Sequence, residues 1–231
     1  MTLRKLSILI PAYNEARTIA ELLDRVRRAE TPVEKEIIVV DDGSSDGTRE
    51  TLEKLQGPGI TVLRHERNRG KGAALRTALA RASGEVVLVQ DADLEYDPRD
   101  YARILEPFLD GRADVVYGSR FLGGPHRVLL FWHYAANVFF TLLTDVLYNV
   151  NLTDMGVCYK AFRTEILRSI PLKSDGFGFE PEVTAKACKR RLRIYEVPIS
   201  YSGRTYAEGK KISWRDGFVY LWCLLRYRFG E

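Results

Sequence analysis

The sequence predicts an α/β fold in which helices flank a mostly parallel sheet. In residues 1–120, short apolar segments with strand character alternate with segments of helical period, and the joins between them are short. This alternation is typical of parallel sheets that helices cover on both faces. A length of 231 residues, with 45% hydrophobic and 29% charged residues, is ordinary for one large folded domain. We therefore expect a single domain over residues 1–231.

The expected elements of the first half follow from apolar runs and turn residues. The expected strands are Leu6–Ile10, Glu36–Val40, Ile60–Arg64, a strand beginning at Val86, and Asp114–Gly118. The expected helices run to about Arg28, include Leu52 and Leu55, run to about Ala82, and lie around Tyr101–Leu109. Asn14 is expected to cap the first of these helices. No GxGxxG follows the first strand and no GxxxxGK[ST] occurs, which disfavours a dinucleotide-binding Rossmann site and a P-loop NTPase.

The second half has a different character. Val128–Val150 is rich in aromatic residues and helical in period, but His133, Asn137 and Asp145 make a membrane-spanning helix improbable. Two interpretations stay open for this segment: a helix at a membrane interface, or a helix that packs on the sheet as ordinary core. Further elements are expected as a helix opened by the 177–181 segment, a strand at 193–201 and a helix at 214–229.

Charge and cysteine content limit the partners and the compartment. Residues 151–231 carry 15 Lys and Arg against 9 Asp and Glu, so this third is the side expected to meet an anion or an acidic membrane surface. A basic solvated face is the alternative. The three cysteines are scattered without CxxC spacing, which indicates reduced thiols in a cytosolic protein. The N-terminus enters a strand at once, so we expect no signal peptide, and nothing indicates nucleic acid as a partner.

A cluster of carboxylates follows the strand that begins at Val86. This apolar strand ends in Asp91, Asp93, Glu95 and Asp97 at alternate positions. Several like charges at the end of a buried strand are costly unless something neutralises them. Hard oxygen ligands suit Mg²⁺ or Mn²⁺, and ligands bind at the carboxyl edge of open α/β sheets. The pattern therefore predicts a divalent metal site at this edge.

Several motifs, taken together, resemble those of the family-2 glycosyltransferases with the Rossmann-like GT-A fold. Within that family the sequence is most similar to the dolichyl- and polyprenyl-phosphate sugar synthases. The motifs are SILIPAYNEA (7–16), IIVVDDGSSDGT (37–48), NRGKGAAL (68–75), QDADLEYDP (90–98), YGSRF (117–121) and EVPISYSGR (196–204). The resemblance implies a GT-A domain with a nucleotide-sugar-binding half at 1–120 and an acceptor-side half with amphipathic C-terminal helices at 121–231.

The resemblance also implies roles for individual residues. The nucleotide-sugar donor would be held by Pro11, Tyr13, Glu15, Asp42, Lys71, Asp91, Ala92, Lys210 and Lys211. Asp91 and Asp93 match the DxD metal motif, and Glu95 stands where these synthases have a third ligand, although the family often has Gln there. The acceptor phosphate would meet Arg120, Arg127 and Arg204. Asp93, Arg120 and Arg204 would be the catalytic residues.

The activity that this resemblance implies is an inverting, metal-dependent transfer from a nucleoside-diphosphate sugar to a polyprenyl or dolichyl phosphate. The donor would be GDP-mannose or a UDP-hexose, and the protein would work peripherally at the cytoplasmic face of a membrane. One alternative is transfer to a soluble or carrier-linked hydroxyl, for which Asp154 or Glu180 could act as a base or be structural. Another alternative is a non-catalytic protein that binds nucleotide sugars.

Overall fold

The computed structural model describes residues 3–128, 130–205, 208 and 214–230, with only the backbone of residues 214 and 215. Its strands form one seven-stranded sheet in the order β3-β2-β1-β4-β6-β5-β7. The strands are β1 (Lys5–Ala12), β2 (Glu34–Asp41), β3 (Ile60–Arg64), β4 (Val86–Val89), β5 (Val115–Ser119), β6 (Lys160–Arg163) and β7 (Ile194–Pro198). β6 is antiparallel to β4 and β5, and the other pairings are parallel. The expected mostly parallel α/β sheet is confirmed.

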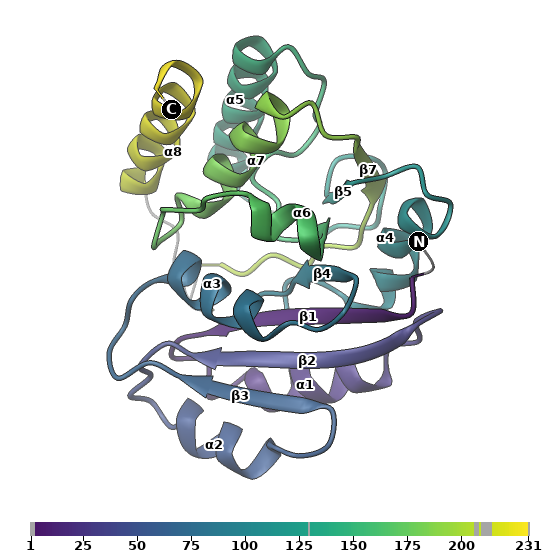
Figure 1. Cartoon of the computed structure of the whole chain (residues 1–231). Helices are drawn as coiled ribbons and strands as arrows, with labels where there is room; N and C mark the ends of the chain where they lie inside the picture. The colour runs from purple at the N-terminus through teal and green to yellow at the C-terminus, as the bar shows by residue number, and fades with distance from the viewer. Residues whose placement is uncertain (1–2, 129, 206–207, 209–213, 231) are drawn as a thin grey trace.

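Helices surround this sheet (Figure 1). They are α1 (Ile19–Arg28), α2 (Thr48–Leu55), α3 (Lys71–Arg81), α4 (Tyr101–Leu109, preceded by a 3-10 turn at Pro98–Asp100), α5 (Phe131–Tyr148), α6 (Thr164–Ser169), α7 (Phe179–Lys189) and α8 (Trp214–Phe229). α5, α7 and α8 lie side by side, away from the β1–β3 end of the sheet. None of the helices in the described ranges is both long and apolar enough to cross a membrane.

The carboxyl edge of the parallel strands positions the candidate site. β4 is buried along its whole length, and the chain leaves the sheet after Val89, so that Asp91 and Asp93 emerge at this edge. The loops after β1 and β2 end beside it. Asn14 does not cap α1, as had been expected, because the helix begins only at Ile19. Asn14 instead has a left-handed backbone with φ 51°, and its side-chain oxygen accepts a hydrogen bond from the Ser45 N–H at 2.9 Å. It thereby joins the loops that follow β1 and β2.

The α5 helix turns its apolar side outward. Trp132 is 80% exposed, and Phe131, Phe139, Leu142 and Val146 are 57–73% exposed. The inner side carries the buried or half-buried side chains Asn137, Thr141 and Thr144, together with the apolar residues Phe140, Leu143 and Tyr148, which pack against α7 and α8. The segment thus packs in part as core, against α7 and α8, and leaves an apolar side exposed.

The neighbouring helix α8 shares this arrangement. Phe218, Trp222 and Phe229 are 63–78% exposed. Cys223, Leu224 and Tyr227 are buried on its inner side. The two helices approach closely, since a Cβ at Gly217 would lie 3.4 Å from the Phe140 ring. The outward apolar sides of α5 and α8, which we call the aromatic face, are thus carried by two packed helices.

Candidate active site

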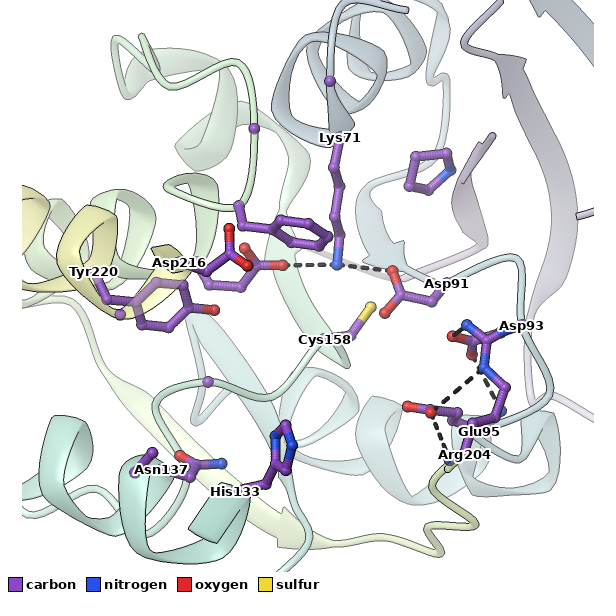
Figure 2. Close-up of a pocket in the computed structure, with 18 of the residues that line it drawn as sticks. Lys71, Asp91, Asp93, Glu95, His133, Asn137, Cys158, Arg204, Asp216 and Tyr220 are labelled. Carbon is purple, nitrogen blue, oxygen red and sulfur yellow. Dashed lines mark hydrogen bonds and ion pairs between the residues drawn. The ribbon is translucent and has the colours of Figure 1, made fainter. Parts of the chain in front are cut away.

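A cavity of about 1100 Å³ lies at the carboxyl edge of the sheet, between it and α5, α7 and α8. Figure 2 shows the labelled side chains pointing into this space from both sides. The predicted site residues that line it are Pro11, Tyr13, Glu15, Asp42, Lys71, Asp91, Ala92, Asp93, Glu95, Arg120 and Arg204. Segments far apart in the sequence therefore meet at one site.

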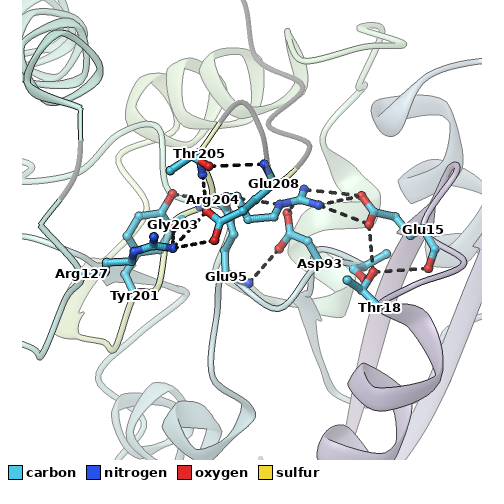
Figure 3. A network of polar contacts seen from close by, with 11 residues as sticks. Glu15, Thr18, Asp93, Glu95, Arg127, Tyr201, Gly203, Arg204, Thr205 and Glu208 are labelled. Atoms are coloured by element: carbon cyan, nitrogen blue, oxygen red, sulfur yellow. Dashed lines mark hydrogen bonds and ion pairs between the residues drawn. The ribbon is translucent and has the colours of Figure 1, made fainter.

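The structure does not place the remaining three predicted residues at the cavity, for two different reasons. Lys210 and Lys211 lie outside the described residues. Arg127 forms an ion pair with Glu208 at 3.1 Å, with both side chains about half exposed, and donates a hydrogen bond to the Gly203 carbonyl at 3.3 Å (Figure 3). Arg127 thus holds the segment after β7, while Arg120 and Arg204 reach the cavity.

Lys71 bridges two carboxylates across the cavity. Its Nζ lies 2.7 Å from Asp91 Oδ1 and 2.7 Å from Glu180 Oε1, and dashed lines mark both ion pairs in Figure 2. Burial acts to lower the pKa of Lys71, but the charges of Asp91, Cys158 and Glu180 raise it well above its ordinary value. Lys71 opens α3 directly after Gly70, whose φ is 94°, and a Cβ at Gly70 would lie 2.4 Å from a backbone oxygen. Because glycine has no Cβ, α3 can begin this close to that backbone oxygen.

Arg204 offsets the negative charge of Asp93 and Glu15 at the cavity. Its Nη2 lies 2.7 Å from Asp93 Oδ2, and its Nη1 lies 3.4 Å from Glu15 Oε2 (Figure 3). Burial raises the pKa of Asp93 to about 7, and the nearby charges of Asp91 and Glu95 add to this rise against the opposing effect of Arg204. The carboxylates of Asp91, Asp93 and Glu95 are thus close enough for their charges to interact. The buried Arg204 Nε has no hydrogen-bond partner among the described residues, although Glu95 Oε1 lies 3.5 Å away.

These carboxylates suit a divalent cation. Asp91 and Asp93 offer hard oxygen atoms on either side of Ala92, and burial, together with the charges of Asp91 and Glu95, raises the pKa of Asp93. No group of three or more His, Cys, Asp or Glu side chains is arranged as a metal site within the described ranges. Glu95 instead accepts hydrogen bonds from the Tyr201 hydroxyl at 2.9 Å and the Arg204 N–H at 2.7 Å. Since Mg²⁺ commonly uses one or two carboxylates plus substrate phosphates, the two aspartates fit, and Glu95 as third ligand stays a prediction.

Asp42 is occupied by the protein itself. Its carboxylate accepts hydrogen bonds from the backbone of Arg69 at 3.0 Å and of Gly70 at 2.7 Å, and it lies 2.6 Å from His65 Nδ1. These bonds hold the loop that leads into Lys71. A direct contact between Asp42 and the donor nucleotide stays a prediction, as do contacts from Pro11.

Arg120 and Asp154 form a bidentate ion pair. Arg120 Nε and Nη2 lie 2.6 and 2.7 Å from the two carboxylate oxygens of Asp154, and the Asn137 amide donates to the same carboxylate at 3.0 Å. Asp154 is fully buried. Its oxygens are thus engaged by donors, which fits a structural role better than that of a base.

Some lining residues were not predicted from the sequence. They include Asn137 and His133 from α5, Cys158 before β6, and Asp216 and Tyr220 from α8. Figure 2 shows Tyr220 and Asp216 on one side of the cavity and Asp93 and Arg204 on the other. The polar residues within the aromatic-rich Val128–Val150 segment could have indicated this. Polar side chains in an otherwise apolar helix usually face a polar partner or a cavity.

The motif residues at these positions belong to a recognisable family. A sequence profile of Glycosyl transferase family 2 matches residues 7–170. The chain belongs to this family. It is therefore a glycosyltransferase.

Two relatives resemble it over most of its length. An undecaprenyl-phosphate mannosyltransferase from Micrococcus luteus is 33% identical over 214 residues, which cover 87% of this chain and 85% of that protein. A dolichol-phosphate mannosyltransferase from Pyrococcus furiosus is 30% identical over 213 residues, which cover 89% of this chain and 59% of that protein. This chain thus matches somewhat more than half of the Pyrococcus protein.

The same fold occurs in a solved glycosyltransferase structure. Glucosyl-3-phosphoglycerate synthase from Mycobacterium tuberculosis, crystallised with Mn²⁺, UDP and phosphoglyceric acid, superimposes with a TM-score of 0.76. The similarity covers 99% of this chain and 80% of the synthase at 22% sequence identity. At that identity the likeness establishes the GT-A-like fold.

Proposed function

We propose that this glycosyltransferase moves a hexose from GDP-mannose or a UDP-hexose to a polyprenyl or dolichyl phosphate, with inversion. The observation that carries the proposal is the composition of the cavity wall. Asp91 and Asp93 line the same cavity as Trp132, Phe139 and Phe218, which belong to the aromatic face. A cavity with a polar donor side and an apolar outer side suits a donor from water and an acceptor from a lipid bilayer.

On the donor side, the residues present are suited to a departing diphosphate. Lys71 and Arg204 are buried or half-buried cations that line the cavity, and both bind the carboxylates of the DxD motif. Asp91 and Asp93 would hold Mg²⁺ or Mn²⁺, which supplies charge stabilisation to the leaving diphosphate when bound. Tyr13, which is 39% exposed at the cavity, is placed to pack beside the base.

On the acceptor side, a lipid phosphate requires no general base. One of its oxygens attacks the anomeric carbon, and the carbon–oxygen bond to the diphosphate breaks on the opposite face, so that no proton has to be removed. The engagement of Asp154 by Arg120 and Asn137 agrees with this. Arg120 would then position the acceptor phosphate, since a guanidinium suits phosphate oxygens.

The aromatic face supports peripheral contact with a membrane. The α5 helix exposes Phe131, Trp132 and Phe139 on its outer side, where a helix at a water-facing surface carries polar residues. Exposed Arg226 and Arg228 in the last turn of α8 suit anionic headgroups beside exposed Phe229. We place the enzyme at the cytoplasmic face of the membrane, the side on which nucleotide sugars and reduced thiols occur. Its three free cysteines agree with this location.

The identity of the acceptor distinguishes the proposed function from its alternatives. Partition of the radiolabelled sugar between organic solvent and water identifies the acceptor. Purified protein would be incubated with Mn²⁺, radiolabelled GDP-mannose or UDP-glucose, and undecaprenyl phosphate, followed by extraction into organic solvent. We expect label in the organic phase only when the polyprenyl phosphate is present. Transfer to a water-soluble hydroxyl with no requirement for lipid would refute the proposal and favour the soluble-acceptor alternative.

A further inference from the structure

We propose that Glu180 is a specificity-determining residue that accepts a hydrogen bond from a hydroxyl of the donor hexose. The inference rests on the proposed function, because it needs a nucleotide sugar in the cavity. Glu180 is the second residue of α7 and lines the cavity opposite the end of β4. Its carboxylate binds Lys71 through Oε1, while its Oε2 has no hydrogen-bond partner among the described residues.

The unpartnered oxygen is unusual because the group is buried. Glu180 is 2% exposed. A buried carboxylate oxygen that lacks a hydrogen bond is costly, so native proteins rarely leave one without a ligand. A Glu in the first turn of a helix is favoured by the helix dipole, but that effect also operates at exposed positions and does not require burial. The dipole therefore does not explain why this oxygen is buried at a cavity wall.

Glu182, two residues further along the same helix turn, shows the contrast. It is also buried, but its oxygens accept hydrogen bonds from the backbone of Lys173 at 2.8 Å and of Ser174 at 2.6 Å, and from Lys186 at 2.5 Å. Glu182 does not occur among the residues that line the cavity. The protein thus satisfies one of the two carboxylates internally and leaves one oxygen of the other for a donor from outside.

The position of Glu180 indicates which part of a nucleotide sugar it meets. A single ammonium group, Lys71 Nζ, separates its carboxylate from that of Asp91. If Asp91 and Lys71 lie at the diphosphate, the group next to them is the sugar that the diphosphate carries. Sugar hydroxyls are donors that a carboxylate oxygen accepts, whereas a diphosphate or a lipid phosphate would be repelled. Burial raises the pKa of Tyr220 well above its ordinary value, so this nearby hydroxyl stays protonated and neutral.

The test compares donor affinities with and without the sugar. Dissociation constants for UDP and UDP-glucose, and for GDP and GDP-mannose, would be measured with Mn²⁺ by calorimetry for the wild type, Glu180→Gln and Glu182→Gln. We expect Glu180→Gln to weaken the nucleotide sugar about tenfold and the bare nucleotide less than about twofold, since a hydrogen bond to a charged acceptor becomes a neutral one. Glu182→Gln should weaken both ligands equally or not at all.

Deoxy sugars locate the hydroxyl. In the wild type, one monodeoxy donor should bind about tenfold more weakly than the parent sugar, and in Glu180→Gln this difference should be much smaller, because the neutral amide oxygen is a weaker acceptor than the carboxylate. Equal weakening of nucleotide and nucleotide sugar would assign Glu180 a structural role through Lys71 and overturn the inference. An unchanged donor affinity with a lowered kcat, seen only with a hydroxyl acceptor, would make it a general base instead. If no nucleotide bound to the wild type, the proposed function itself would have failed. If Glu180→Gln does not fold, Glu180→Asp replaces it in the test. Aspartate keeps the negative charge, and its shorter side chain moves the oxygen away from the sugar.

Discussion

Replacing Asp154 by Asn tests whether this carboxylate holds the site together or acts as a base. Asp154 is fully buried, and the Arg120 side chain that it binds is 14% exposed. The substitution keeps the shape of the side chain but leaves the Arg120 guanidinium in the protein interior without a counter-charge. We expect the variant to lose stability, because an uncompensated buried charge costs far more than an exposed one.

The size of the effect follows from the burial of the pair. Breaking a buried ion pair by removing one partner costs about 3–5 kcal/mol of unfolding free energy. For a chain of this length, each kcal/mol shifts the melting temperature by about 2–4 °C, so the melting temperature should fall by roughly 6–20 °C. The exposed pair between Arg112 and Asp110 is a matched control, with side chains 47% and 49% exposed. Asp110→Asn should cost less than about 1 kcal/mol.

Thermal unfolding followed by circular dichroism measures both variants under the same conditions. Combining Asp154→Asn with Arg120→Gln should recover part of the lost stability, since the second change removes the unpaired charge. The reasoning is refuted if Asp154→Asn melts within about 2 °C of the wild type, as the Asp110 control should. Such a result, together with a lowered kcat toward a hydroxyl acceptor, would return Asp154 to the role of base.

Three further outcomes are expected. Asp91→Asn should lower metal-dependent turnover at least about 100-fold; retained turnover would contradict the metal role. Trp132→Ser and Trp222→Ser should each weaken sedimentation with anionic vesicles about tenfold, since partial burial of an indole contributes about 1–2 kcal/mol. Burial acts to raise the pKa of Glu36, but hydrogen bonds from Ser7 and other partners lower it to about 2. The stability that Glu36 provides over Glu36→Gln should therefore be present above pH 4.5 and disappear as the pH falls toward 2, in melting curves across that range.

The edge of the sheet that carries the site could be predicted from the sequence. Parallel strands place their carboxyl ends together, so Tyr13, Asp42 and Asp91 were expected to meet, and all three line one cavity. This inference requires only strand order and direction. The short strand β6 could not be found in this way, because KAFR has no alternation and acts as a strand only through pairing with β4 and β5.

Contacts across long sequence separations were also beyond the sequence. Nothing in the spacing of Lys71 and Glu180 indicates that one ammonium binds both Glu180 and Asp91. Helical periodicity places the apolar residues of Val128–Val150 on one side but does not state whether that side meets protein or surroundings. Packing against α7 and α8 decides this, and it turns Asn137 inward and Trp132 outward.

The compensation of charge at the cavity explains why the cations of the site come from distant segments. Asp91 and Asp93 lie two residues apart, and each is bound by a cation from elsewhere: Lys71 from the start of α3, and Arg204 from the segment after β7. A diphosphate is a stronger partner for both cations than a single carboxylate, because it offers more acceptor oxygens and more charge. On the proposed function, donor binding therefore releases the two aspartates from Lys71 and Arg204 at the moment when their oxygens are needed as metal ligands. The donor and the metal cation then bind cooperatively. The donor draws Lys71 and Arg204 away from the aspartates that the metal needs, and the metal frees Lys71 and Arg204 for the diphosphate.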